Sequence, residues 1–82
     1  MELGNLVNMR NLNVSSNGIE VLDISKLKKL EVLNVSHLKL KRLVIEDSKN
    51  LKVIDASHNF LRHLDLSQNR KITELNLGYN RL

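Results

Sequence analysis

Apolar residues return along this chain with a period of 21 residues, each time in the same order. When residues 30–50 are taken as one period, positions 1, 4, 6, 11, 14 and 16 are apolar in every repeat, and no charged residue enters these columns. Position 4, for example, holds Leu12, Leu33, Ile54 and Leu75. A constant period of this length is typical of a solenoid, in which each repeat is one coil that buries its apolar side against its neighbours.

Two short stretches in each period alternate between apolar and other residues, as in residues 12–14 and 22–24. Alternation points the apolar side chains to one side of an extended segment. Neither stretch keeps a 3.6-residue period over the length of a helix. We therefore expect one strand per coil, a second short extended or irregular segment on the opposite side, and little or no helix. Strands of successive coils should pair in parallel, about 4.8 Å apart.

Asparagine occupies position 9, just after the first stretch, in three of the four repeats: Asn17, Asn59 and Asn80. The chain turns inward there, and the turn leaves backbone N–H and C=O groups without partners. An amide side chain both donates and accepts hydrogen bonds, so stacked asparagines can satisfy these groups as a structural ladder. The second repeat has Leu38 instead, and we expect it to gain apolar burial and to have a distorted turn.

The segments LKVIDASHNFL (51–61), ITELNLGYNRL (72–82) and RHLDLSQNRK (62–71) resemble the leucine-rich repeat family. The match is to its 21-residue subclass, with the pattern L-x-x-L-x-L-x-x-N-x-L-x-x-L-D-L-x-x-N-x-x. This resemblance implies a solenoid with short parallel strands on a concave face and mostly irregular or short extended segments on a convex side. Leu38 and Val44, the latter in place of the aspartate seen at Asp23 and Asp65, are departures from the pattern.

Phasing the period predicts one solenoid segment over residues 1–82. Residues 1–8 are the end of a repeat, residues 9–29, 30–50 and 51–71 are full repeats, and residues 72–82 are a partial one. No terminal cap with a polar outer face is recognisable. We therefore expect a fragment of a longer solenoid, whose open ends would fray or associate with another copy.

Composition excludes several classes of function. The chain has no cysteine, and no apolar run is long enough to span a membrane. Its net charge of +4 is concentrated in two basic groups, but Phe60 and Tyr79 are its only aromatic residues and offer no platform for stacking bases. We therefore do not expect a nucleic acid ligand, and a solvated outer face is the favoured interpretation. The first basic group is a single column of Lys28, Lys49 and Arg70. The second is a cluster of Lys41, Arg42 and Arg62 in the second half of the period.

Nothing in the composition indicates a compartment. The N-x-S triplets at Asn13 and Asn34 match a glycosylation signal, but such triplets arise freely from the repeat itself. Localisation is left open.

The strand side that faces away from the core is the candidate binding surface. Positions 5, 7 and 8 are expected there, and position 8 lines up two imidazoles and a phenol. We expect a partner to contact Asn13, Ser15, Asn34, Ser36, His37, Asp55, Ser57, His58, Asn76 and Tyr79.

A catalytic or metal site is not favoured, and we expect neither enzymatic activity nor a cofactor. A catalytic zinc ion needs at least three protein ligands, which His37, His58 and the distant His63 do not supply. The serines that precede the histidines lack an orienting carboxylate in a closed pocket. Protonation of adjacent imidazoles below about pH 6 would instead weaken binding or stacking.

These observations favour a module that binds another protein, of unknown identity, across the concave strand face. A rigid grid of side chains recognises a partner by preorganisation rather than by chemistry. Two alternatives stay open. The segment is a structural spacer or self-associates end to end, or it is the regulatory repeat region of a larger signalling protein or receptor.

Overall fold

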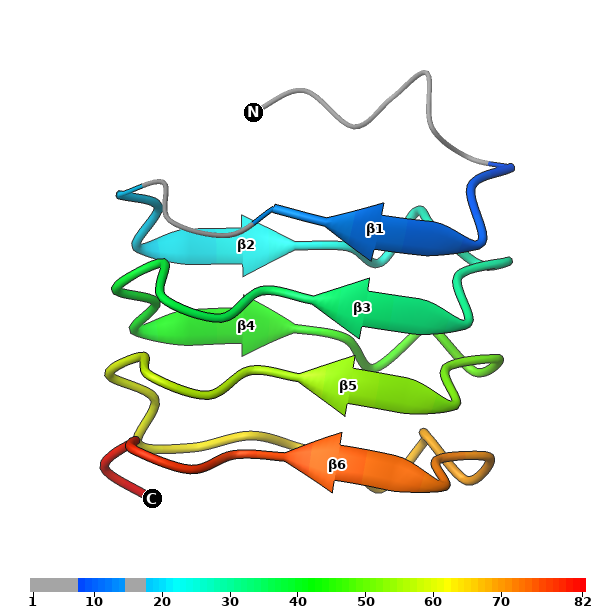
Figure 1. Ribbon diagram of the computed structural model, residues 1–82. Helices are drawn as coiled ribbons and strands as arrows, with labels where there is room; N and C mark the ends of the chain where they lie inside the picture. The colour runs from blue at the N-terminus through cyan, green and yellow to red at the C-terminus, as the bar shows by residue number, and fades with distance from the viewer. Residues whose placement is uncertain (1–7, 15–17) are drawn as a thin grey trace.

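The computed structural model describes residues 8–14 and 18–82 of the chain. The chain winds into a parallel β-solenoid of about 3 turns, with one strand of each coil on the near side and a second extended segment behind it (Figure 1). No residue of the described ranges is helical, as the sequence predicted. The strands are β1 (Asn11–Asn13), β2 (Val21–Asp23), β3 (Val32–Asn34), β4 (Arg42–Val44), β5 (Val53–Asp55) and β6 (Glu74–Asn76).

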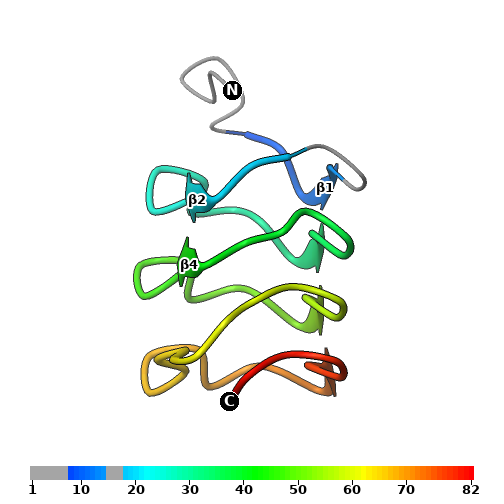
Figure 2. The ribbon, with the colours of Figure 1, turned by 90° about the vertical axis from the view of Figure 1, so that its left-hand side faces the viewer.

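The strands form two parallel sheets, one of four strands in the order β1-β3-β5-β6 and one that pairs β2 with β4. Their register equals the sequence period, because Leu12 lies opposite Leu33 and Leu33 lies opposite Ile54. Each position of the period therefore becomes a column that runs along the stack of coils, as the view from the side shows (Figure 2). The hydrogen bonds from the Val35 amide to the Asp55 carbonyl (2.8 Å) and from the Ala56 amide to the Asn76 carbonyl (2.9 Å) extend this pairing beyond the strands.

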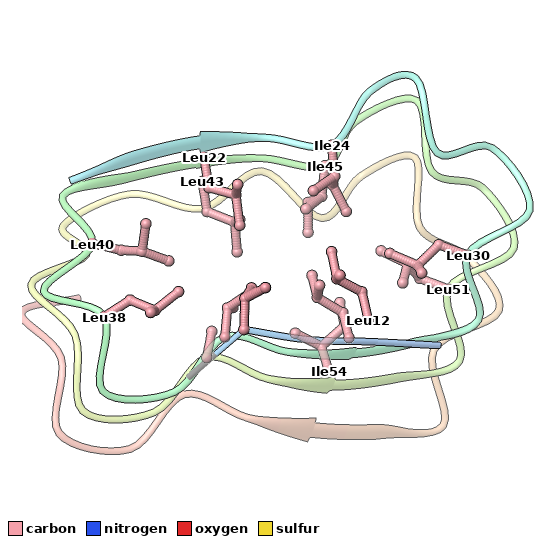
Figure 3. Close-up of a cluster of buried hydrophobic side chains, with 14 of the residues drawn as sticks. Leu12, Leu22, Ile24, Leu30, Leu38, Leu40, Leu43, Ile45, Leu51 and Ile54 are labelled. Carbon is pink, nitrogen blue, oxygen red and sulfur yellow. The ribbon is translucent and has the colours of Figure 1, made fainter. Parts of the chain in front are cut away.

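The apolar columns from both sheets meet between them and form one core (Figure 3). Each three-residue strand buries its middle residue, as the alternation predicted, except that Leu75 of β6 is 43 % exposed. Fully buried leucine and isoleucine side chains each contribute about 1.5–3 kcal/mol relative to exposure. Those buried completely include Ile24, Leu27, Leu30, Leu33, Leu38, Leu40, Ile45, Leu51 and Leu61.

Asn59 fills the turn after β5 and makes five hydrogen bonds. Its Oδ1 accepts from the backbone amides of Leu38 and Leu40, both at 3.0 Å. Its Nδ2 donates to the carbonyl oxygens of Val35, Ala56 and Ser57 at 2.9 to 3.1 Å. One side chain thus satisfies backbone groups in its own coil and in the preceding one.

Asn80 repeats this arrangement one coil further on. Its Oδ1 accepts from the Leu61 amide at 3.0 Å, and its Nδ2 donates to the Ala56 carbonyl at 2.9 Å. Asn17, the remaining asparagine of this column, lies outside the described residues.

The opposite turns contain a second buried column, at position 19, where the repeat pattern has its second asparagine; the sequence analysis assigned it no role. Position 19 holds Leu27, Ser48 and Asn69, all of which are buried. The Ser48 hydroxyl donates to the Ile24 carbonyl at 3.2 Å, and Asn69 Nδ2 donates to the carbonyl oxygens of Ile45 and Ser48 at 2.9 Å. The coils 30–50 and 51–71 are therefore joined by buried side-chain hydrogen bonds at both turns, through Asn59 at one turn and Asn69 at the other.

The second repeat is irregular where the sequence departs from its pattern. Leu38 is completely buried in the apolar core, which confirms the expected gain of apolar burial. Its turn has two left-handed residues, His37 (φ 56°) and Lys39 (φ 62°), whereas the next repeat has only His58 in that conformation (φ 55°). The extra left-handed residue at Lys39 is the distortion that the loss of asparagine predicted.

Val44, the other departure, also has a structural consequence. In the following coil, Asp65 Oδ1 accepts hydrogen bonds from the Ser67 hydroxyl (2.6 Å) and the Ser67 amide (2.9 Å). These two bonds hold the pKa of Asp65 below its ordinary value of 3.8, because they stabilise the charged carboxylate. A valine cannot accept such bonds, so the turn after β4 lacks this side-chain support.

Candidate functional site

The outward side of the four-stranded sheet, with the turn residues that follow its strands, is termed here the four-stranded face. The residues on either side of each buried strand centre point outward, since side chains alternate along a strand. Three columns therefore cross this face. They are Asn11, Val32, Val53 and Glu74 at position 3, Asn13, Asn34, Asp55 and Asn76 at position 5, and His37, His58 and Tyr79 at position 8.

The three rings at position 8 form one continuous stack. The ring centroids of His37 and His58 lie 4.1 Å apart with planes inclined by 12°, and those of His58 and Tyr79 lie 4.3 Å apart with planes inclined by 11°. All three residues are exposed, and Tyr79 has an exposed fraction of 79 %. The stack is an exposed row of rings that runs across three coils.

The backbone at these three positions is left-handed, with φ of 56° at His37, 55° at His58 and 58° at Tyr79. This conformation costs an L-residue with a bulky side chain about 1–2 kcal/mol, and glycine or asparagine is its usual occupant. Backbone strain of this kind clusters at functional sites. The three residues share this conformation, so their rings leave the backbone in the same direction and lie one above another.

Position 5 presents polar groups that are held by the residue two places on. Asn34 Oδ1 accepts from the Ser36 amide and hydroxyl at 3.1 and 2.8 Å, and Asp55 Oδ1 accepts from those of Ser57 at 3.1 and 2.6 Å. One oxygen of each side chain is thus committed to its own turn. The Nδ2 of Asn34 and the second oxygen of Asp55 make no hydrogen bond with the described residues.

The expectation that Ser36 and Ser57 face a partner is wrong. Both are buried, with exposed fractions of 8 % and 5 %, and their hydroxyls donate to the side chains two residues earlier, Asn34 and Asp55. They hold the position 5 side chains in place and do not form part of the outer surface. The N-x-S triplet at Asn34 therefore has a local structural use. Ser15 lies outside the described residues.

The sequence analysis missed the column at position 3. Val32, which is 37 % exposed, and the half-buried Val53 lie next to each other on the outward side of β3 and β5. The sequence does contain the signal for this column. Side chains alternate along a strand, so the residue before each buried leucine points outward just as the residue after it does.

An ion-paired row borders the valines. Glu31 contacts Arg10 Nη1 at 3.1 Å and Lys52 Nζ at 3.5 Å, joining three successive coils. Exposed pairs of this kind add about 0–1 kcal/mol of stability each. On the two central strands, β3 and β5, charged, apolar, polar and aromatic residues therefore follow one another across the face.

The described residues hold no group of three or more histidine, cysteine, aspartate or glutamate side chains that could bind a metal ion. The serine hydroxyls next to the histidines donate to Asn34 and Asp55 and do not donate to imidazole nitrogens. Within the same residues, no helix is long and apolar enough to cross a membrane.

The fold defines the class of the molecule: it is a short, two-sided β-solenoid built from 21-residue coils. Comparisons with models of known protein families, with curated protein sequences and with solved structures found no match.

Proposed function

We propose that the chain is a protein-interaction module of the leucine-rich repeat type, which binds another protein across its four-stranded face. The observation that carries the proposal is the stack of His37, His58 and Tyr79. Three solvent-exposed rings occupy strained backbone positions and form an exposed row. Tyrosine and other aromatic residues dominate the energetics of protein interfaces, because they offer a large contact area at a low entropic cost.

The composition of the face supports the same function. An apolar patch at Val32 and Val53 lies between the Glu31 ion pairs and the polar side chains of Asn34 and Asp55. An apolar centre with a polar rim is the usual anatomy of a protein interface. The short coils hold every column in register, so that binding orders few side chains and costs little entropy.

The test compares three baits: the wild-type chain, the double variant His58→Ala/Tyr79→Ala, and the control double variant Lys49→Ala/Arg70→Ala. The control removes two exposed side chains from the turns that precede the strands. Each bait is checked by far-UV circular dichroism and then used to capture proteins that are identified by mass spectrometry. We expect a captured protein that is retained by wild type and control and lost by the ring variant. Equal capture by all three folded baits would contradict the proposal.

A second candidate function is self-association into a longer solenoid. It is favoured by Leu75, which is 43 % exposed on β6 at the edge of the four-stranded sheet, whereas Leu33 at the same position is buried. An edge strand with an exposed apolar residue is a template for another strand. Sedimentation velocity at increasing concentration distinguishes the two functions. Association that disappears in Leu75→Lys but persists in His58→Ala/Tyr79→Ala would favour assembly.

A further inference from the structure

A cavity of about 430 Å³ lies outside the four-stranded face and is lined by Lys41, Phe60, Arg62, His63 and Arg81. The period explains why these residues meet. Lys41 and Arg62 both occupy position 12, and Phe60 and Arg81 both occupy position 10, so that successive coils place them one above another. In each coil these residues come after the position 8 ring, at positions 10 to 13, in the segments at the left of Figure 1.

Backbone hydrogen bonds between the coils fix this arrangement. The Phe60 amide donates to the Leu40 carbonyl at 2.7 Å, and the Arg81 amide donates to the Leu61 carbonyl at 2.9 Å. These bonds set the spacing of the side chains that surround the cavity.

The cavity has a large excess of positive charge. Lys41, Arg62 and Arg81 are cationic, and Arg62 and Arg81 form no ion pair with the described residues. Lys41 meets Glu20 at 3.9 Å, but both side chains are about two-thirds exposed, at 65 % and 67 %, so the contact neutralises the cavity weakly. Like charges that line one concave surface repel each other and attract an anion.

Phe60 adds a wall of a different kind. The Arg81 guanidinium carbon lies 4.8 Å from the centroid of the Phe60 ring, within the range of a cation–π contact. This contact limits the positions of the guanidinium, and the residue Phe60 is still 37 % exposed. The cavity therefore combines the guanidinium group of Arg81, positioned by Phe60, with the apolar surface of the Phe60 ring.

We propose that this cavity binds a phosphate monoester. A phosphate monoester carries about −1.5 to −2 charges at neutral pH and has three acceptor oxygens, which suit two guanidinium groups and an ammonium group. A carboxylate brings one charge and two oxygens, and would leave the cavity positive. A volume of about 430 Å³ also exceeds the space needed for phosphate alone, so the organic part of the ester can lie against Phe60.

The test is a titration of the wild-type chain with phenyl phosphate at low ionic strength, followed by two-dimensional ¹H–¹⁵N NMR. We expect saturable shifts that are centred on residues 60–63 and 81, with a Kd on the order of 1 mM, as befits a small exposed site. Benzoate, which has the same ring and a single charge, should bind about tenfold more weakly. Equal affinity for benzoate, or shifts spread over every basic residue, would overturn the proposal.

A pair of matched variants separates a built site from general charge attraction. Arg62→Gln/Arg81→Gln removes two positive charges from the cavity, and Lys49→Gln/Arg70→Gln removes two from the turns that precede the strands. All four residues are exposed, so neither change should prevent folding. We expect the affinity for phenyl phosphate to fall about tenfold or more in the first variant and less than about twofold in the second. An equal loss in both would refute the site.

The source of the ester is resolved by two further probes, a phosphoserine peptide and glycerol 3-phosphate. A peptide that binds more tightly than the free ester, and that loses its affinity when it is not phosphorylated, identifies a phosphorylated protein as the source. Comparable affinities identify a free phosphate ester. The inference does not depend on the four-stranded face, because His58→Ala/Tyr79→Ala leaves the cavity residues in place and should retain phenyl phosphate binding.

Discussion

Replacement of Asn59 by alanine should destabilise the protein more than any change on its surface. Asn59 is 2 % exposed, and its side chain links two coils by hydrogen bonds to five backbone groups. Asn59→Ala leaves the amides of Leu38 and Leu40 without an acceptor, and neither residue has any exposed surface to bring water to them.

The magnitude follows from these two orphaned donors. A buried polar group that loses its partner costs about 1–3 kcal/mol. Two such amides give about 2–6 kcal/mol, and the under-satisfied carbonyl oxygens add to this. A chain of this length has a free energy of unfolding of about 4–12 kcal/mol, at ~0.05–0.15 kcal/mol per residue. The substitution should therefore remove a large share of the total stability.

The assay is urea denaturation followed by far-UV circular dichroism, with free energies of unfolding from linear extrapolation. Asn80→Ala is the internal control, because it is half-buried and its Oδ1 accepts from one amide, that of Leu61. It should cost about half as much, ~1–3 kcal/mol. If Asn59→Ala costs less than about 1 kcal/mol, or no more than Asn80→Ala, the argument from buried hydrogen bonds is refuted.

Two further predictions concern the carboxyl group of Asp65 and the core. Because hydrogen bonds from Ser67 lower the pKa of Asp65 below 3.8, its stabilising effect is present above that pH and lost as the pH falls through the lowered value. Urea titrations from pH 5 to 2 should show a smaller loss of stability in Asp65→Asn than in wild type, and identical pH profiles would contradict this. Leu33→Ala should cost about 2–5 kcal/mol in a urea titration, because Leu33 is completely buried between the sheets, and a cost below about 1 kcal/mol would show that the core is loosely packed.

The sequence predicted which side chains build the coils better than it predicted which side chains lie on the outer surface. The columns at positions 1, 4, 6 and 11 were assigned to the core on the basis of the period, and the pattern alone placed Asn59 in a turn. By contrast, Ser36 and Ser57 were assigned to the outer surface and are buried. The error has a physical reason: alternation along a strand holds only while the backbone is extended. These serines come after the strands end, where the turn rotates their hydroxyls toward Asn34 and Asp55.

The 21-residue period determined the solenoid, the parallel pairing, the register and the composition of each column, because a repeat of constant length can stack in register only by placing equivalent residues next to each other. Only the tertiary structure showed how neighbouring columns interact. The stacking of His37, His58 and Tyr79 depends on left-handed backbone angles, and the cavity beside Phe60 depends on how side chains from positions 10, 12 and 13 of different coils approach one another. The period sets the order of residues along a column. The distance between columns depends on the turns, where the backbone departs from any regular pattern.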